Sequence, residues 1–164
     1  SIFSLAFSWI STKVPVFFFF FAQKDYKQLD VLFKKTLIQS TVLNAIALIT
    51  FFSLIFILRH FHLKVAGKNF ADRFLSFLPM FFMMIPILLN HVIVSWATYL
   101  RCHKKEPMLI QSVIMGILCS ISTITLGKYF GVIGMTLGYM ILTITGFIWT
   151  YFIFITKKKE WHNE

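Results

Sequence analysis

Residues 36–58, TLIQSTVLNAIALITFFSLIFIL, contain no charged side chain. A helix needs about 20 consecutive, mainly apolar residues to cross the hydrocarbon core of a bilayer. This stretch therefore predicts a transmembrane helix.

The same kind of stretch recurs along nearly the whole chain. Hydrophobic residues make up 58% of the sequence and include 21 Phe, which leaves too little polar surface to coat a water-soluble globule. We predict an all-α, polytopic membrane helix bundle. Its five transmembrane helices are expected at about residues 1–21, 36–58, 74–100, 108–126 and 132–155.

The polar connectors between these stretches differ in charge from one side to the other. Ten cations fall on one side, namely Lys24, Lys27, Lys34, Lys35, Arg101, Lys104, Lys105, Lys157, Lys158 and Lys159. Only five fall on the opposite side, namely Arg59, Lys64, Lys68, Arg73 and Lys128. Lys and Arg in short loops favour the cytoplasmic side, so we predict a cytoplasmic C-terminus with a basic tail at 156–164. These cations meet lipid headgroups, and nucleic acid is not an expected partner.

The first connector has helical periodicity of its own. Tyr26, Leu29, Phe33 and Leu37 recur at helical spacing, while charged residues take the other directions. This pattern is typical of an interfacial helix, at about residues 24–35, that continues into the second span. A solvated, charged lead-in to that span explains the pattern equally well.

Lys13 is the one cation inside a predicted span. A cation at membrane depth costs about 2.5–3.5 kcal/mol on insertion scales, so it should face a water-filled cavity or an anionic partner. Pro15 follows two residues later and disturbs the helical hydrogen bonds beside it. The alternative is a shifted or tilted span that brings Lys13 to an interface.

The third predicted span carries Pro79 and Pro86 on one helical face, together with Asn90. Two prolines on one face predict a kinked helix. Asn90 and His91 are expected either to hydrogen-bond across helices or to contact a polar substrate.

Small residues form stripes along the last two predicted spans. Gly116 belongs to the first stripe, and Gly134 and Gly138 belong to the second. Small side chains let helix backbones approach closely, so these glycines are predicted packing positions. Gly131 lies in the very short turn between the two spans, which predicts an antiparallel hairpin.

The sequence contains no recognisable catalytic or metal-binding motif. There is no glycine-rich phosphate loop, no paired carboxylate within a span and no informative arrangement of Ser, His and Asp. His91 has no second ligand at helical spacing, and two cysteines give no disulfide framework. We therefore expect no enzyme activity, no metal and no cofactor.

Two stretches resemble the C-terminal part of a polysaccharide-biosynthesis (O-antigen-type) flippase of the multidrug/oligosaccharidyl-lipid/polysaccharide exporter superfamily. The first is WISTKVP at 9–15, followed by AQKDYKQLD at 22–30. The second is YLRCHKKEP at 99–107, followed by LGKYFGVIG at 126–134.

The resemblance implies an inner-membrane transporter of 12 to 14 helices in two lobes, of which residues 1–155 form most of the C-terminal lobe. Its partners would be membrane lipids, the remaining N-terminal half of the same protein, and a polyprenyl-pyrophosphate-linked oligosaccharide that it flips by alternating access. Lys13 is then the expected residue for the pyrophosphate or an acidic sugar, and Asn90 and Gln111 for sugar hydroxyls. Kinks at Pro15, Pro79 and Pro86 would let helices bend between states.

Two other functions remain open from the sequence. One is an ion-coupled exporter of drugs or small molecules from the same superfamily. No carboxylate lies within a span, so any ion relay would depend on the other half of the protein. The other is a membrane enzyme of polysaccharide assembly, which the short outer connector near 59–73 disfavours.

Overall fold

The computed structural model describes residues 2–60, 64–65, 68–69, 76–102 and 106–162. Arg73, Lys104 and Lys105, counted above in the charge pattern, lie outside the described residues. The start of the third predicted span, residues 74–75, lies outside them as well.

The first predicted span forms two short helices. These are α1 (Ile2–Ser11) and α2 (Val14–Ala22). They meet at Thr12 and Lys13, just before Pro15, which occupies the first turn of α2. The proline ring is accommodated in a first turn but clashes with the carbonyl four residues earlier in a continuous helix, which accounts for the break.

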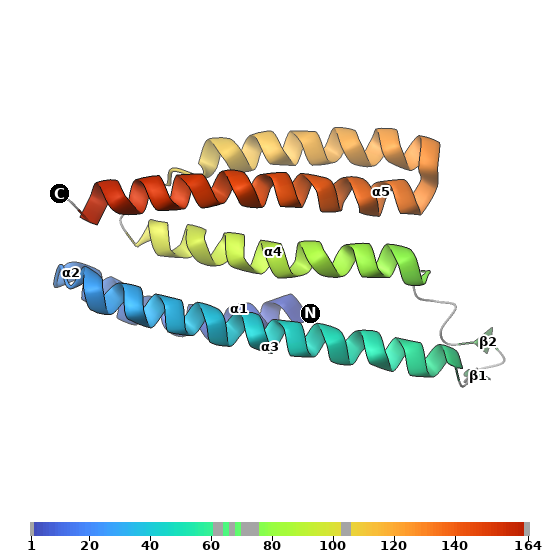
Figure 1. The fold of residues 1–164 in the computed structure, drawn as a ribbon, viewed down its shortest axis with the longest axis horizontal. Coiled ribbons are helices and arrows are strands. Elements are labelled where there is room, and N and C mark those ends of the chain that lie inside the picture. Colours follow the sequence, from blue (N-terminus) through green and yellow to red (C-terminus); the bar gives the residue numbers. More distant parts are fainter. Residues whose placement is uncertain (1, 61–63, 66–67, 70–75, 103–105, 163–164) are drawn as a thin grey trace.

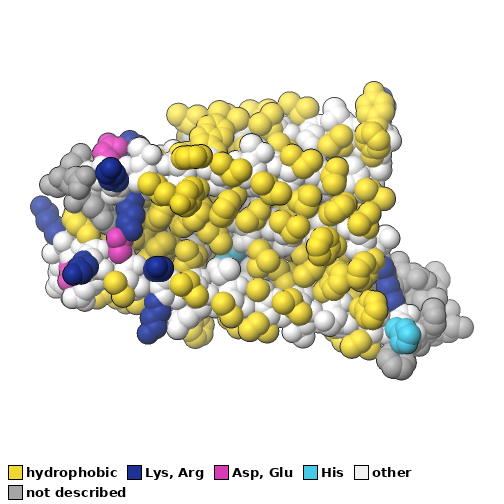
Figure 2. Space-filling model, in the orientation of Figure 1, with side chains coloured by type: hydrophobic (Ala, Val, Ile, Leu, Met, Phe, Trp, Pro, Cys, Tyr) yellow, Lys and Arg dark blue, Asp and Glu magenta, His cyan; other side chains and the backbone are white. Residues whose placement is uncertain are grey.

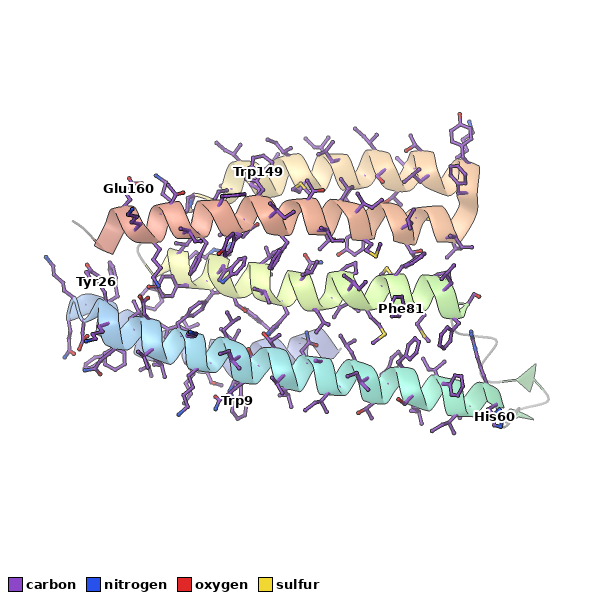
Figure 3. All side chains as sticks on the ribbon, viewed as in Figure 1. Trp9, Tyr26, His60, Phe81, Trp149 and Glu160 are labelled. Atoms are coloured by element: carbon purple, nitrogen blue, oxygen red, sulfur yellow. The ribbon has the colours of Figure 1, made fainter. Side chains whose placement is uncertain are left out.

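The interfacial helix and the second span predicted from the sequence form one continuous helix, α3 (Tyr26–His60). Asp25 precedes it, and its Oδ1 accepts a hydrogen bond of 3.1 Å from the backbone N–H of Gln28. This contact satisfies a donor that the first helical turn leaves without a partner. Tyr26 and His60 lie at opposite ends of the bundle (Figure 3).

A short antiparallel pair, β1 (Lys64–Val65) and β2 (Lys68–Asn69), follows α3. The chain then returns along α4 (Phe77–Arg101). The last helix, α5 (Leu109–His162), reverses direction at Gly131, whose φ of 60° and ψ of −145° lie in a region that only glycine adopts readily. We call residues 109–130 the first arm and residues 132–162 the second arm. The two arms lie antiparallel, as the sequence predicts (Figure 1).

The helices pack side by side with α4 between α3 and the α5 hairpin (Figure 1). The buried core is richest at the end where α2 meets the start of α3 and the end of α4. There the ring centroids of Phe33 and Tyr99 lie 4.6 Å apart. The ring of Trp96 stacks on that of Phe154, with 5.4 Å between the centroids. Aromatic pairs at these distances add to the stabilisation from burial alone.

The outer surface is largely apolar. Hydrophobic side chains cover most of the face seen in Figure 2, while cations and acids gather at the end that holds the C-terminus. Large apolar residues such as Ile124, Phe130 and Phe152 are exposed. In water so large an exposed apolar surface would be a liability, so it indicates a lipid environment.

Among the described helices, three are long and apolar enough to cross a membrane, namely α3, α4 and α5. The predicted all-helical class is confirmed, apart from the small β hairpin, and the architecture is compatible with a membrane helix bundle. The count of five spans stays a prediction, because α1 and α2 are each short and α5 holds both of the last two predicted spans.

Candidate functional site

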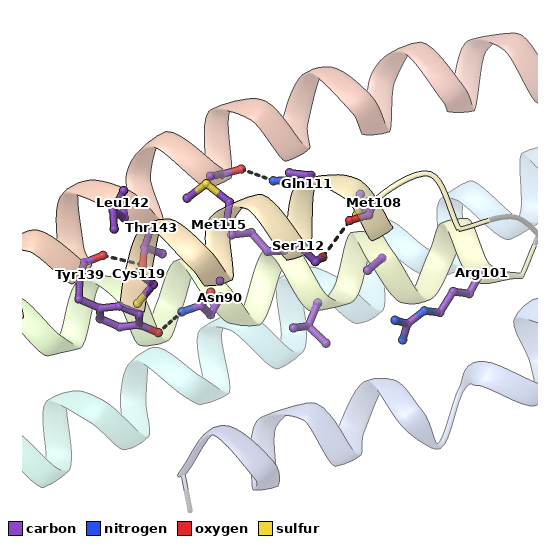
Figure 4. Close-up of a pocket in the computed structure, with 15 residues that line it drawn as sticks. Asn90, Arg101, Met108, Gln111, Ser112, Met115, Cys119, Tyr139, Leu142 and Thr143 are labelled. Carbon is purple, nitrogen blue, oxygen red and sulfur yellow. Dashed lines mark hydrogen bonds between the residues drawn. The ribbon is translucent and has the colours of Figure 1, made fainter. Parts of the chain in front are cut away.

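A cavity of about 420 Å³ lies between α4 and the two arms of α5 (Figure 4). This volume falls in the range of small-molecule sites. Two residues chosen from the sequence, Asn90 and Gln111, both line it. The other lining residues are Ile93, Val94, Ala97, Arg101, Met108, Ser112, Met115, Gly116, Cys119, Tyr139, Leu142, Thr143 and Gly146.

Asn90 joins α4 to the second arm of α5. Its Nδ2 donates a hydrogen bond of 2.8 Å to the hydroxyl of Tyr139, shown as a dashed line in Figure 4. Of the two roles left open for this amide, the structure shows the interhelical hydrogen bond. Contact between the side-chain oxygen of Asn90 and a ligand stays a prediction.

Gln111 holds the two arms of α5 together. Its Nε2 donates to the backbone carbonyl of Gly146 at 3.0 Å and to the hydroxyl of Thr150 at 2.6 Å. The side chain is buried, so both donors are used inside the hairpin. Only its carbonyl oxygen is left for a ligand in the cavity.

Arg101 stands at the cation-rich end of the same cavity. Its Nε lies 3.3 Å from Oε1 of Glu106, and both side chains are more than half exposed. An exposed pair of this kind contributes little to stability, so the guanidinium can exchange partners at low cost. From the sequence, Arg101 counted only as a connector charge. Its position at the end of an apolar span is the feature of the sequence that could have indicated a role at the end of the cavity.

Lys13 lies elsewhere. It occupies the break between α1 and α2, is exposed, and does not line the cavity. It pairs with no acidic side chain within the described part of the chain. The structure therefore brings Asn90 and Gln111 together and leaves Lys13 apart from them.

The two prolines of α4 occupy different environments. Pro79 is in the first turn, where a proline is tolerated, and Pro86 is inside the helix, where it removes one backbone hydrogen bond. Both are buried. Bending at Pro15, Pro79 and Pro86 during transport stays a prediction.

The three glycines singled out from the sequence also differ. A Cβ at Gly134 would lie 2.6 Å from the carbonyl oxygen of Leu126, and one at Gly138 would lie 2.6 Å from Oγ of Ser122. Both glycines therefore allow the two arms to approach closely. A Cβ at Gly116 would meet nothing within 4 Å, because this residue borders the cavity.

A second polar group lies between α3 and α4. The hydroxyl of Ser40 donates to the carbonyl of Leu37, and Nε2 of His91 lies 3.0 Å from the same oxygen. When the Ser40 proton is donated to Leu37, Nε2 is the donor to Ser40; in the other tautomer of His91, Nε2 accepts from the hydroxyl. Asn44 is fully buried one turn further along α3, and its amide has no hydrogen-bond partner among the residues that the structure describes.

The chain matches no protein-family model, no curated protein and no solved structure. Among the described residues, no group of three or more His, Cys, Asp or Glu could hold a metal ion. The class that the fold defines is an apolar helix bundle suited to a membrane. The cavity between α4 and α5 has a mainly apolar wall, two amides and one arginine.

Proposed function

We propose that this chain is part of a membrane transporter that moves a lipid-linked oligosaccharide across the bilayer by alternating access. The resemblance of residues 9–15 and 99–107 to polysaccharide flippases supports the proposal. The apolar outer surface and the concentration of cations at one end support it as well.

The observation that carries the proposal is the position of Lys13. Nine residues of α2 separate it from the cation-rich end, which is about 13 Å of helix. Its side chain is exposed, and no acid within the described residues neutralises it. An ammonium group at this depth is stabilised by water or by an anion, and a pyrophosphate headgroup passing along α1 and α2 would supply that anion. A compact, mobile lysine charge suits a substrate that must be released again.

The proposed orientation follows from the same charges. The cation-rich end holds the start of α3, with Lys27, and the end of α5, with Lys158 and Lys159, and we place it in the cytoplasm. In this arrangement α1 and α2 together make the first of five crossings, and each arm of α5 makes one. The compartment is the inner membrane of the cell.

The test is a Lys13→Ala substitution in the full-length protein, expressed in its native cells. We expect loss of surface polysaccharide with unchanged abundance of the protein in the membrane. Lys27→Ala is the matched control, because Lys27 is an exposed lysine at the cation-rich end. Normal polysaccharide in the Lys13→Ala strain would remove Lys13 from the mechanism.

The cavity favours one alternative, an exporter of small molecules. Its volume of about 420 Å³ suits a drug-sized compound, and Asn90 and Gln111 offer amide oxygens to it. A deletion strain that becomes sensitive to drugs while it keeps its surface polysaccharide would favour the exporter over the flippase.

A further inference from the structure

The cavity between α4 and α5 has the shape of a slot along the bundle. Asn90 and Arg101 both line it from α4, about 16 Å apart at 1.5 Å of rise per residue. A smaller pocket of about 220 Å³ adjoins its end, and the two share Arg101, Ala97, Met108 and Ser112. The slot therefore runs along α4 from Asn90 to Arg101, near the cation-rich end of the bundle (Figure 4).

The wall of this slot is mainly hydrocarbon. Ile93, Val94 and Leu142 are aliphatic, and Met108 and Met115 can adjust their shape to a flexible chain. The open space beside Gly116 adds room at its middle.

Most hydroxyl and amide donors of the wall already have an acceptor within the protein. The hydroxyl of Thr143 donates to the carbonyl of Tyr139, and that of Ser112 donates to the carbonyl of Met108. One N–H of the Asn90 amide is donated to Tyr139, and both N–H groups of Gln111 are donated within the hairpin. A ligand rich in hydroxyl groups would find few donors here, whereas a hydrocarbon chain needs none.

Arg101 adds a positive charge and hydrogen-bond donors at the end of the apolar slot. A guanidinium has five N–H donors, and Nε of Arg101 lies 3.3 Å from Oε1 of Glu106. Two of the remaining donors can form the paired hydrogen bonds that phosphate accepts from arginine. Glu106 would then be displaced into solvent, where it is already more than half exposed.

We propose that this slot binds one hydrocarbon chain of an anionic membrane lipid, whose phosphate is held by Arg101. The apolar wall and the arginine at its end match the two halves of such a lipid. The site requires only that the bundle lies in a bilayer, so it goes beyond the proposed transport activity and does not depend on the oligosaccharide.

The test is photo-cross-linking of the full-length protein in nanodiscs. The probe is phosphatidylglycerol with a diazirine on one acyl chain, in a phosphatidylcholine background, and cross-linked peptides are identified by mass spectrometry. We expect labelling at Met115 or Leu142. Arg101→Gln should reduce it about tenfold through loss of the charge-assisted hydrogen bonds. Gly116→Leu should reduce it similarly by filling the slot, with Arg101 left in place.

Lys27→Gln serves as the matched control and should leave labelling unchanged, because Lys27 is exposed and does not line the slot. Equal labelling of the wild type and the Gly116→Leu variant would overturn the chain site. Phosphatidylcholine also has a phosphate but is zwitterionic, so equal labelling by a diazirine phosphatidylcholine would overturn the preference for an anionic lipid. Unchanged labelling of the Arg101→Gln variant would overturn the role of Arg101 in phosphate binding. Competition by inorganic phosphate as strong as that by unlabelled phosphatidylglycerol would show a phosphate site without a lipid, and would also overturn the proposal. These readouts measure binding alone, so a failure of transport leaves them unchanged.

Discussion

The hydroxyl of Tyr99 donates a hydrogen bond of 2.5 Å to Oδ1 of Asp30, across an interval of 69 positions in the chain. The second carboxylate oxygen of Asp30 lies 2.7 Å from Nζ of Lys158. The ammonium of Lys158 also lies over the rings of Tyr99 and Phe154, about 6 Å from their centroids.

These contacts join the start of α3, the end of α4 and the second arm of α5 at the cation-rich end. Tyr99 is fully buried, while Asp30 and Lys158 are each about a third exposed. A hydrogen bond to a charged acceptor is stronger than one between neutral groups. The three helices are therefore fixed to one another at this end by a small polar cluster beside the aromatic core.

Tyr99→Phe removes the hydroxyl and keeps the ring. We expect the free energy of unfolding to fall by about 1.5–3 kcal/mol, the usual contribution of a hydrogen bond to a charged group. Denaturant titration in mild detergent measures the change. Tyr151→Phe is the control, because Tyr151 is 45% exposed, and its effect should stay within about 0.5 kcal/mol. Equal losses in both variants would contradict a specific role for the Asp30 contact.

Much of the helical framework could be predicted from the sequence, because its signals are local. An uncharged apolar stretch marks α3, and the periodicity of Tyr26 and Leu29 extends that helix toward the connector. Pro15 marks the break beside Lys13, and Gly131 marks the reversal within α5. Each signal acts within a few residues of the feature that it produces.

The composition of the site could not be predicted in the same way. The sequence singles out Gln111 by its polarity and Asn90 by its polarity and its place on the proline face. They line one cavity because the hairpin sets the second arm against α4. Contacts such as that of Asp30 with Tyr99 depend on the packing of helices distant in sequence. No periodicity along one helix carries that information.

The hydrogen bond between Asn90 and Tyr139 can be measured by a double-mutant cycle of Asn90→Leu and Tyr139→Phe. Hydrogen bonds between helices in membranes contribute about 0.6 kcal/mol on average and up to about 1.7 kcal/mol. We expect a coupling free energy in that range from unfolding in detergent. Strictly additive effects of the two substitutions would show that the bond contributes nothing to stability.

Replacement of Asn44 should have the opposite effect on stability to replacement of Asn90. Its amide is fully buried and has no hydrogen-bond partner within the described part of the chain, so it loses the hydration of a polar group without compensation. Asn44→Leu keeps a similar volume and should raise the free energy of unfolding by about 1–3 kcal/mol. The same titration applied to Asn90→Leu should show a decrease. A decrease for both would mean that Asn44 makes a stabilising contact, for example with a buried water molecule.

The glycines of α5 should respond in opposite directions to alanine. Gly134→Ala places a Cβ against the backbone carbonyl of Leu126, which cannot move aside cheaply, and should destabilise the hairpin by about 1–3 kcal/mol. Gly116→Ala meets no atom within 4 Å and should stabilise the helix by about 0.5–1 kcal/mol through its lower backbone entropy in the unfolded state. Thermal unfolding of the two single variants in the same detergent measures both. Destabilisation by Gly116→Ala would mean that another surface packs on this glycine.

Cys102, directly after α4, should resist thiol reagents while the protein is folded. Burial raises the pKa of its thiol from 9.0 to about 11, and the thiolate is the reactive form. In a Cys119→Ser variant, maleimide labelling should be slow at pH 8 and fast after denaturation. The folded protein keeps this proton between pH 9 and 11, while the unfolded chain loses it. The contribution of the thiol to stability is therefore fully present below pH 9 and declines as the pH rises toward 11. Rapid labelling of the folded protein at pH 8 would show that Cys102 is accessible and that its thiol ionises as in an unfolded chain.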